Sequence, residues 1–136
     1  MATLNVPSGL LKMIFLKEAA RAPISAISLM RALAEKTKRA WQPGPGSIYY
    51  LTNELELKGL VKKLLLESER YPKYIITPKG REELESMTKT SIKDVIKLMR
   101  ILQLYSDIIE DKYLSEQMDN ICRTLLEKYE SPLKYS

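Results

Sequence analysis

The chain has 136 residues, of which 45% are hydrophobic and 29% are charged, and its formal net charge is +5. This composition is typical of a globular chain with a core and excludes a disordered polyelectrolyte. One cysteine, Cys122, and no histidine exclude an intrachain disulfide, a zinc finger and a Cys/His catalytic pair. We expect a buried, inert Cys122 and a cytoplasmic protein. Residues 1–6 lack the pattern of a signal peptide, and we expect no transmembrane span.

The excess positive charge lies in the first two thirds of the chain. Residues 1–88 hold 14 Lys/Arg against 9 Asp/Glu, a net charge of +5, whereas residues 89–136 hold 8 of each and are neutral. A basic segment beside a neutral one is typical of a nucleic-acid reader joined to an assembly element. We therefore predict two domains, residues 1–88 and residues 89–136.

Two amphipathic helices are expected near the start. Ser8 can cap the first helix, and Ala22-Pro23 ends it. Ser25 can cap the second helix, which ends in the charged run Glu35–Arg39. The cations in this run are Lys36, Lys38 and Arg39. They either complement the negative end of the helix dipole or contact a phosphate backbone, and both roles stay open.

A turn followed by a third helix occupies the middle of the sequence. The run Pro43-Gly44-Pro45-Gly46 excludes a helix before Pro45, which suits a first helical turn because its missing N–H is not needed there. On a helical wheel one face holds Ile48, Leu51, Thr52 and Leu55, and the opposite face holds Gly46, Tyr50, Asn53 and Leu57. Gly59 permits the chain to leave the helix. The amides of Gly46 and Ser47 at its start can bind a phosphate.

A two-stranded hairpin is expected after the third helix. The aliphatic runs Val61–Leu66 and Tyr74–Ile76 flank a polar loop, with Arg70 and Lys73 at the loop tip. Thr77 then caps a fourth helix that begins with Pro78. The order helix, helix, helix, strand, strand, helix predicts a mainly α (α+β) fold, a winged helix-turn-helix domain.

The C-terminal region is expected to form two further helices. A break is predicted at Lys89-Thr90-Ser91, followed by a helix that runs to Ile109 and another over Ser115–Tyr129. Their apolar face is too wide for a lone surface helix, so the helices pair either within the chain or with a second chain. The residues predicted to form this dimerisation face are Ile92, Val95, Ile96, Met99, Leu102, Ile109, Ile121 and Leu125.

The run from Trp41 to Val61 resembles the signature of the PadR family of transcriptional regulators. That family carries Trp-x-Pro-x-Pro-Gly-Ser/Thr-Ile-Tyr on the approach to its DNA-recognition helix, and the matching residues here are Trp41, Pro43, Pro45, Gly46, Ser47, Ile48 and Tyr49. The similarity continues through Gly59-Leu60-Val61 and Gly80-Arg81, and it covers Leu10 to Met87. The sequence departs from the family at Ile24–Ser28, where a His-Gly-Tyr element is common, and at Tyr50, where a proline is common.

The resemblance implies a sequence-specific regulator of double-stranded DNA that acts as a homodimer through its C-terminal helices and represses transcription. Asn53 suits an adenine edge, and tyrosine hydroxyls suit phosphates or bases. The residues predicted to bind DNA are Lys36, Lys38, Arg39, Ser47, Tyr49, Tyr50, Asn53, Arg70 and Lys73. We expect no cofactor and no metal ion.

Other functions stay open at this point. A winged helix can serve as a protein-interaction module that does not bind DNA, and the apolar Leu57 on the outer face of the third helix favours that alternative. An enzyme is not expected, because the sequence shows no metal cluster, nucleophile–base pair or phosphate-binding loop. Tyr105 and Tyr113 leave open a small-molecule effector pocket in the C-terminal helices.

Overall fold

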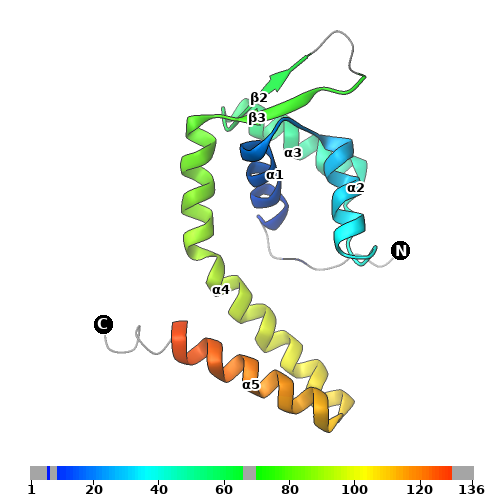
Figure 1. Ribbon diagram of the computed structural model, residues 1–136, viewed down its shortest axis with the longest axis vertical. Helices are drawn as coiled ribbons and strands as arrows, with labels where there is room; N and C mark the ends of the chain where they lie inside the picture. The colour runs from blue at the N-terminus through cyan, green and yellow to red at the C-terminus, as the bar shows by residue number, and fades with distance from the viewer. Residues whose placement is uncertain (1–5, 7–8, 66–69, 130–136) are drawn as a thin grey trace. The chain divides into compact units, whose positions relative to one another are not determined.

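The computed structural model describes residues 6, 9–65 and 70–129 and divides into two compact units, residues 1–87 and 88–136 (Figure 1). Its elements are α1 (Leu10–Arg21), β1 (Ile24–Ser25), α2 (Ala26–Lys36), α3 (Pro45–Leu57), β2 (Val61–Leu64), β3 (Lys73–Ile76), α4 (Pro78–Ile109) and α5 (Lys112–Tyr129). The predicted fold class, a mainly helical winged helix-turn-helix followed by C-terminal helices, is confirmed. The predicted roles of the two segments stay predictions.

The first unit is built on three helices, two of which begin as the sequence indicates. Ser28 N–H donates to Ser25 Oγ at 3.2 Å, which confirms the cap of α2. Pro45 occupies the first turn of α3, as predicted. Ser8, the predicted cap of α1, lies outside the described residues, and α1 starts after Gly9, whose φ of 92° is left-handed.

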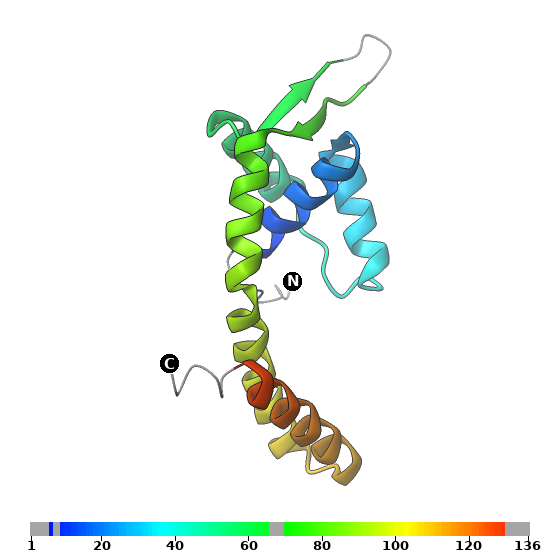
Figure 2. The ribbon, with the colours of Figure 1, turned by 60° about the vertical axis from the view of Figure 1, so that its left-hand side comes forward.

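A small antiparallel sheet completes the winged helix, with strand order β1-β3-β2. Both views show the β2–β3 hairpin extending beyond the helices (Figure 1 and Figure 2). The strand β1 was not predicted, because two residues carry no periodicity and pair only with the distant β3, where Ile24 lies opposite Tyr74. The predicted start of the second strand is also wrong by one residue. Lys73, which was expected at the loop tip, lies in β3 opposite Leu64.

The core of this unit lies between the helices and the sheet. α2 packs against α3, and α1 packs against β3. Phe15 and Tyr74 join α1 to β3 by an edge-to-face contact with ring centroids 5.7 Å apart. The buried members of the core are Phe15, Leu16, Ala19, Ala26, Leu29, Leu33, Ile48, Leu55, Leu60, Val61, Tyr74 and Ile76. Trp41 is partly buried and packs at the edge of this core.

The end of α3 is held by the start of α4. Gly59 has φ of 74°, so the chain leaves α3 through a left-handed residue, as predicted. Thr77 Oγ1 donates to Gly59 O at 2.6 Å, and Lys79 Nζ donates to Lys58 O at 3.0 Å. Thr77 Oγ1 also accepts from Gly80 N–H at 3.0 Å, which confirms the predicted cap of α4. These contacts satisfy carbonyls that the last turn of a helix leaves without partners.

The second unit is a helical hairpin formed by the C-terminal part of α4 and by α5. The predicted break at Lys89-Thr90-Ser91 is wrong, because α4 continues through all three residues. Serine and threonine are only weakly unfavourable inside a helix, and no glycine or proline interrupts the run. The last helix starts at Lys112, earlier than the predicted Ser115, because Asp111 Oδ1 accepts from Leu114 N–H at 2.8 Å and caps it.

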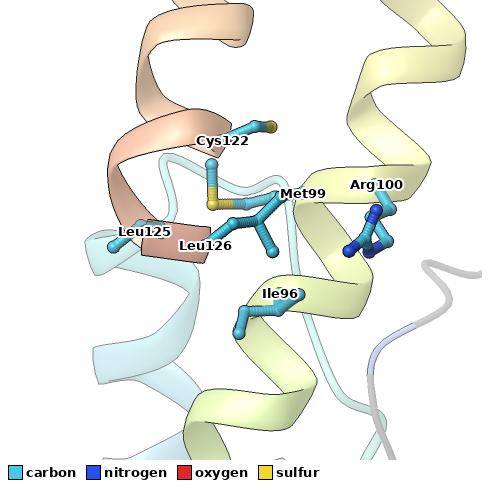
Figure 3. Close-up of a pocket in the computed structure, with 6 residues that line it drawn as sticks. All are labelled: Ile96, Met99, Arg100, Cys122, Leu125 and Leu126. Carbon is cyan, nitrogen blue, oxygen red and sulfur yellow. The ribbon is translucent and has the colours of Figure 1, made fainter. Parts of the chain in front are cut away.

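The two helices of this hairpin pack through part of the predicted dimerisation face. Both views show α5 running back beside α4, and the hydroxyls of Ser106 and Ser115 lie 3.1 Å apart near the turn (Figure 1 and Figure 2). Six residues surround a cavity of approximately 10 Å³ between the helices: Ile96, Met99, Arg100, Cys122, Leu125 and Leu126 (Figure 3). Cys122 is buried, as expected, and this burial raises the pKa of its thiol.

One close contact at the α3–α4 junction yields a stability test. A Cβ added at Gly80 would lie 2.1 Å from Leu60 O, so the two backbones must separate to admit it. We expect Gly80→Ala to lower the free energy of unfolding by about 1–3 kcal/mol, as overpacking does. Urea unfolding measures this change.

The matched control is Gly46→Ala in α3, where an added Cβ meets no atom within 4 Å. We expect this variant to be as stable as the parent chain or slightly more stable, because alanine favours a helix over glycine. Equal losses of stability in the two variants would contradict the packing argument.

Candidate nucleic-acid interface

The start of α3 presents backbone donors at the surface. Gly44 precedes the helix in an extended conformation and has no side chain that could cap it. The first intrahelical hydrogen bond runs from Ile48 N–H to Gly44 O at 3.2 Å. The amides of Gly46 and Ser47 therefore precede the helical ladder, and both residues are exposed. Such a helix start attracts a phosphate through its amides and its dipole.

The two faces of α3 differ as the helical wheel predicts. Ile48, Thr52 and Leu55 are at most 1% exposed and fix the inner face on the core. The hydroxyl of Thr52 is satisfied within the helix, since it donates to Tyr49 O at 3.0 Å. The outer face exposes Gly46, Tyr50, Asn53 and Leu57, with Tyr50 70% exposed and Leu57 88% exposed. We call these four residues the outer stripe. Ser47 and Tyr49 lie beside it and are exposed too.

The carboxylates that flank the outer stripe are paired with lysines. Lys58 Nζ lies 2.7 Å from Glu54 Oε1, and Lys63 Nζ lies 3.7 Å from Glu56 Oε1. The hydrogen bond from Lys58 lowers the pKa of Glu54, and the same bond raises the pKa of Lys58. The four-residue spacing of Glu54 and Lys58 could have indicated the first pair, whereas Lys63 reaches Glu56 from β2. Both pairs reduce the repulsion that two carboxylates would exert on a nearby polyanion.

The predicted cations after α2 stand on an unusual turn. α2 ends at Lys36, and the next two cations, Lys38 and Arg39, have left-handed φ values of 50° and 68°. Such a conformation costs a non-glycine residue roughly 1–2 kcal/mol. Arg39 N–H donates to Ala34 O at 2.7 Å, and Trp41 N–H donates to Thr37 Oγ1 at 3.0 Å. These bonds hold the turn, and all three cations are exposed.

A fourth cation joins this group and was missed from the sequence. Arg31 lines a concave surface with Ala34, Glu35, Lys38, Arg39 and Gln42. Arg31 lies one helical turn before Glu35, the first residue of the charged run at the end of α2. This spacing could have identified Arg31 from the sequence. The surface brings Arg31, Lys38 and Arg39 together at the end of α2.

The hairpin separates the two predicted wing cations. Arg70 is exposed, and its guanidinium carbon lies 5.6 Å from the ring centroid of Tyr71, a cation–π distance. Lys73 is half-buried in β3 and faces Leu64 and Ser25 across the ladder. The glutamates Glu67 and Glu69 of the loop lie outside the described residues.

The second unit exposes an apolar row on α4. Its members, Val95, Leu98, Leu102, Tyr105 and Ile109, are 40% to 64% exposed, and we call them the α4 row. Their spacing of three and four residues is that of a coiled-coil seam. Of the predicted dimerisation residues, the intrachain hairpin uses Ile96, Met99 and Leu125, Ile92 is half-buried, and Val95, Leu102, Ile109 and Ile121 are exposed. Sequence periodicity could not make this division.

The remaining sequence predictions concern an effector pocket, a metal site and a membrane span. The cavity of Figure 3 has about the volume that one water molecule needs, and its lining includes neither Tyr105 nor Tyr113. Both tyrosines are exposed. Within residues 6, 9–65 and 70–129 no cluster of three metal-ligating side chains occurs. No helix in this part of the chain is long and apolar enough to cross a membrane.

The helices α2 and α3, the hairpin that follows them and the outer stripe define a winged helix-turn-helix protein with an exposed candidate recognition helix. Residues 15–86 match the model of the transcriptional regulator PadR-like family. This match covers 72 of the 136 residues, so the chain belongs to that family. The family consists of transcriptional regulators.

Solved structures of regulators share the fold. The chain superposes with a TM-score of 0.57 on a transcriptional regulator from Clostridium thermocellum, at 18% identity, covering 78% of this chain and 96% of that one. A PadR-like transcriptional regulator from Bacillus cereus gives 0.57 at 23% identity, with coverages of 70% and 93%. A regulator from Thermoplasma acidophilum gives 0.57 at 23% identity, with coverages of 71% and 91%. No curated protein matches the chain.

Proposed function

We propose that this PadR-family protein binds specific sequences in double-stranded DNA, acts as a cytoplasmic homodimer and represses transcription. One observation carries the proposal: α3 buries its apolar face in the core and presents a polar and aromatic face, including Tyr50 and Asn53, to solvent. An α-helix of this kind fits the major groove, where each base pair displays a distinct pattern of donors and acceptors. Family membership supports the regulatory role.

The base-reading and backbone-binding roles fall on different residues. Asn53 pairs with an adenine edge, and Tyr49 and Tyr50 supply hydroxyls to bases or phosphates. The amides at Gly46 and Ser47 bind one phosphate where the helix enters the groove. The cations Arg31, Lys36, Lys38, Arg39, Arg70 and Lys73 bind phosphates around it. Of these, Arg31 was not predicted from the sequence, and it is proposed because it shares a concave surface with Lys38 and Arg39.

The homodimer is proposed to form through the α4 row. Its large apolar side chains are exposed in the single chain, whereas α5 covers Ile96 and Met99 on another side of the same helix. A row of this length and spacing is stabilised when a second helix packs its own row into it. Two-fold symmetry makes such a contact self-complementary, because the same patch serves both chains. The dimer would then present two copies of α3.

A protein-interaction module is the alternative. The exposure of Leu57 favours it, since an apolar side chain on a surface helix can dock on a protein. A retardation assay separates the two functions. A DNA reader with this many cations retards random duplex at about 50 mM salt and releases it as salt rises. An interaction module shows no retardation at any salt concentration.

The dimer is tested by changing the α4 row without changing the hairpin. We expect Leu102→Asp to convert a dimer at micromolar concentration into a monomer, because it places a carboxylate in the contact. Leu102 is 49% exposed, so the hairpin itself should stay folded. Sedimentation equilibrium gives the mass, and circular dichroism checks the helix content.

Lys93→Asp is the matched control, because Lys93 is exposed and stands nine residues before Leu102, half a turn away around the helix. This variant should remain dimeric. A parent chain that sediments as a monomer, or a Leu102→Asp variant that stays dimeric, would contradict the proposed contact.

The division of roles on the DNA surface is tested by two variants. We expect Asn53→Ala to cost about 1–3 kcal/mol on the preferred duplex and little on random duplex, because it removes base readout. Arg70→Ala should weaken binding to both duplexes by a similar factor and reduce the log–log salt slope by about one unit.

Arg70 is the better wing variant, because replacing Lys73 would also change a paired strand position. Titrating each variant on the preferred and on the random duplex, at several salt concentrations, measures the change in affinity for all four combinations. If Asn53→Ala weakens all sequences alike while Arg70→Ala changes the preferred site, the assigned roles are reversed.

A further inference from the structure

Leu57 is the most exposed large apolar side chain in the described part of the first unit, at 88%. It closes the outer stripe, seven residues after Tyr50 and four after Asn53. At 100° per residue these three side chains point to the same side of α3. A single exposed leucine needs no explanation in general. Leu57, however, lies on the outer stripe together with Asn53, whose amide is proposed to read a base.

The fold itself does not need an apolar residue at this position. The core contacts of α3 come from Ile48, Thr52 and Leu55 on the opposite face. Leu57 is the last residue of the helix, and the exit from the helix is held by Thr77 and Lys79 through backbone carbonyls. A polar side chain at position 57 would therefore cost the folded chain little.

The electrostatic surroundings of Leu57 suit an uncharged contact in a groove of DNA. Glu54 and Glu56 flank the outer stripe, and each is paired with a lysine, at 2.7 Å and at 3.7 Å. The stripe itself carries no charge, since it consists of glycine, a phenol, an amide and an isobutyl group. A duplex can approach Asn53 and Leu57 together without meeting an unpaired carboxylate from these two glutamates.

We propose that Leu57 contacts the C5-methyl group of a thymine in the major groove, about two base pairs from the base that Asn53 reads. This proposal rests on the proposed function. The thymine methyl is the one apolar group that base pairs display in that groove. The four-residue step from Asn53 to Leu57 is about 6 Å along the helix, and base pairs are spaced by about 3.4 Å. The preferred site therefore contains a thymine about two base pairs from the adenine bound by Asn53.

The test removes the methyl group alone. A preferred duplex is first selected from a random library with the full-length protein. Each thymine is then replaced in turn by deoxyuridine, which keeps every hydrogen-bonding group and lacks the methyl. We expect one replacement per half-site to weaken binding roughly fourfold, the effect of leaving one buried methyl group without its contact. In the Leu57→Ala variant, the same replacement should have no effect.

Two further variants serve as controls. Leu57→Met keeps an apolar side chain and should keep the preference for thymine over deoxyuridine. Asn53→Ala should also keep that preference while it loses the preference for adenine. If the parent chain and Leu57→Ala discriminate equally at every thymine, the proposal is overturned while DNA binding stands. If no duplex is retarded or selected at all, the proposed function fails first, so the two failures are distinguishable.

Discussion

Burial of one face of α3 is the constraint on which the rest of the structure depends. Ile48, Thr52 and Leu55 are almost fully buried among residues of α1, α2 and the sheet. Because a helix has a fixed period, burying these positions forces Tyr50, Asn53 and Leu57 outward. The exit of α3 is fixed as well, since Thr77 and Lys79 bind its last carbonyls and Gly80 admits Leu60 O at close range. The outer stripe is therefore positioned both by the buried face of α3 and by the contacts at the C-terminal end of that helix.

Features encoded by near neighbours could be predicted from the sequence, and features that need distant partners could not. The caps at Ser25 and Thr77, the start of α3 at Pro45 and its two faces each depend on a few adjacent residues. The strand β1 exists only because β3 pairs with it from far along the chain. Lys73 lies in a strand for the same reason. The continuity of α4 through Lys89-Thr90-Ser91 was missed because polar residues resemble a loop, although none of them breaks a helix.

The same distinction between features set by near neighbours and features that need distant partners holds for the candidate site. The wheel of α3 identified the exposed Tyr50 and Asn53, but it could not show that Lys63 of β2 pairs with Glu56. The left-handed turn at Lys38 and Arg39 could not be predicted either, because it depends on hydrogen bonds to Thr37 and Ala34. On α4 the apolar positions were found, but only the structure divides them between the hairpin and the exposed row. A helix that is apolar on several sides does not reveal which side meets which partner.

We propose that two copies of α3, joined by the C-terminal helices, read DNA together. Selection of bound duplexes from a random library, followed by footprinting of the enriched sequence, tests this claim most directly. A symmetric pair of readers predicts a pseudo-palindromic site whose half-sites lie about 34 Å apart, one turn of B-DNA, with both halves protected. Enrichment of a single asymmetric half-site, or no enrichment over the starting library, would contradict the account.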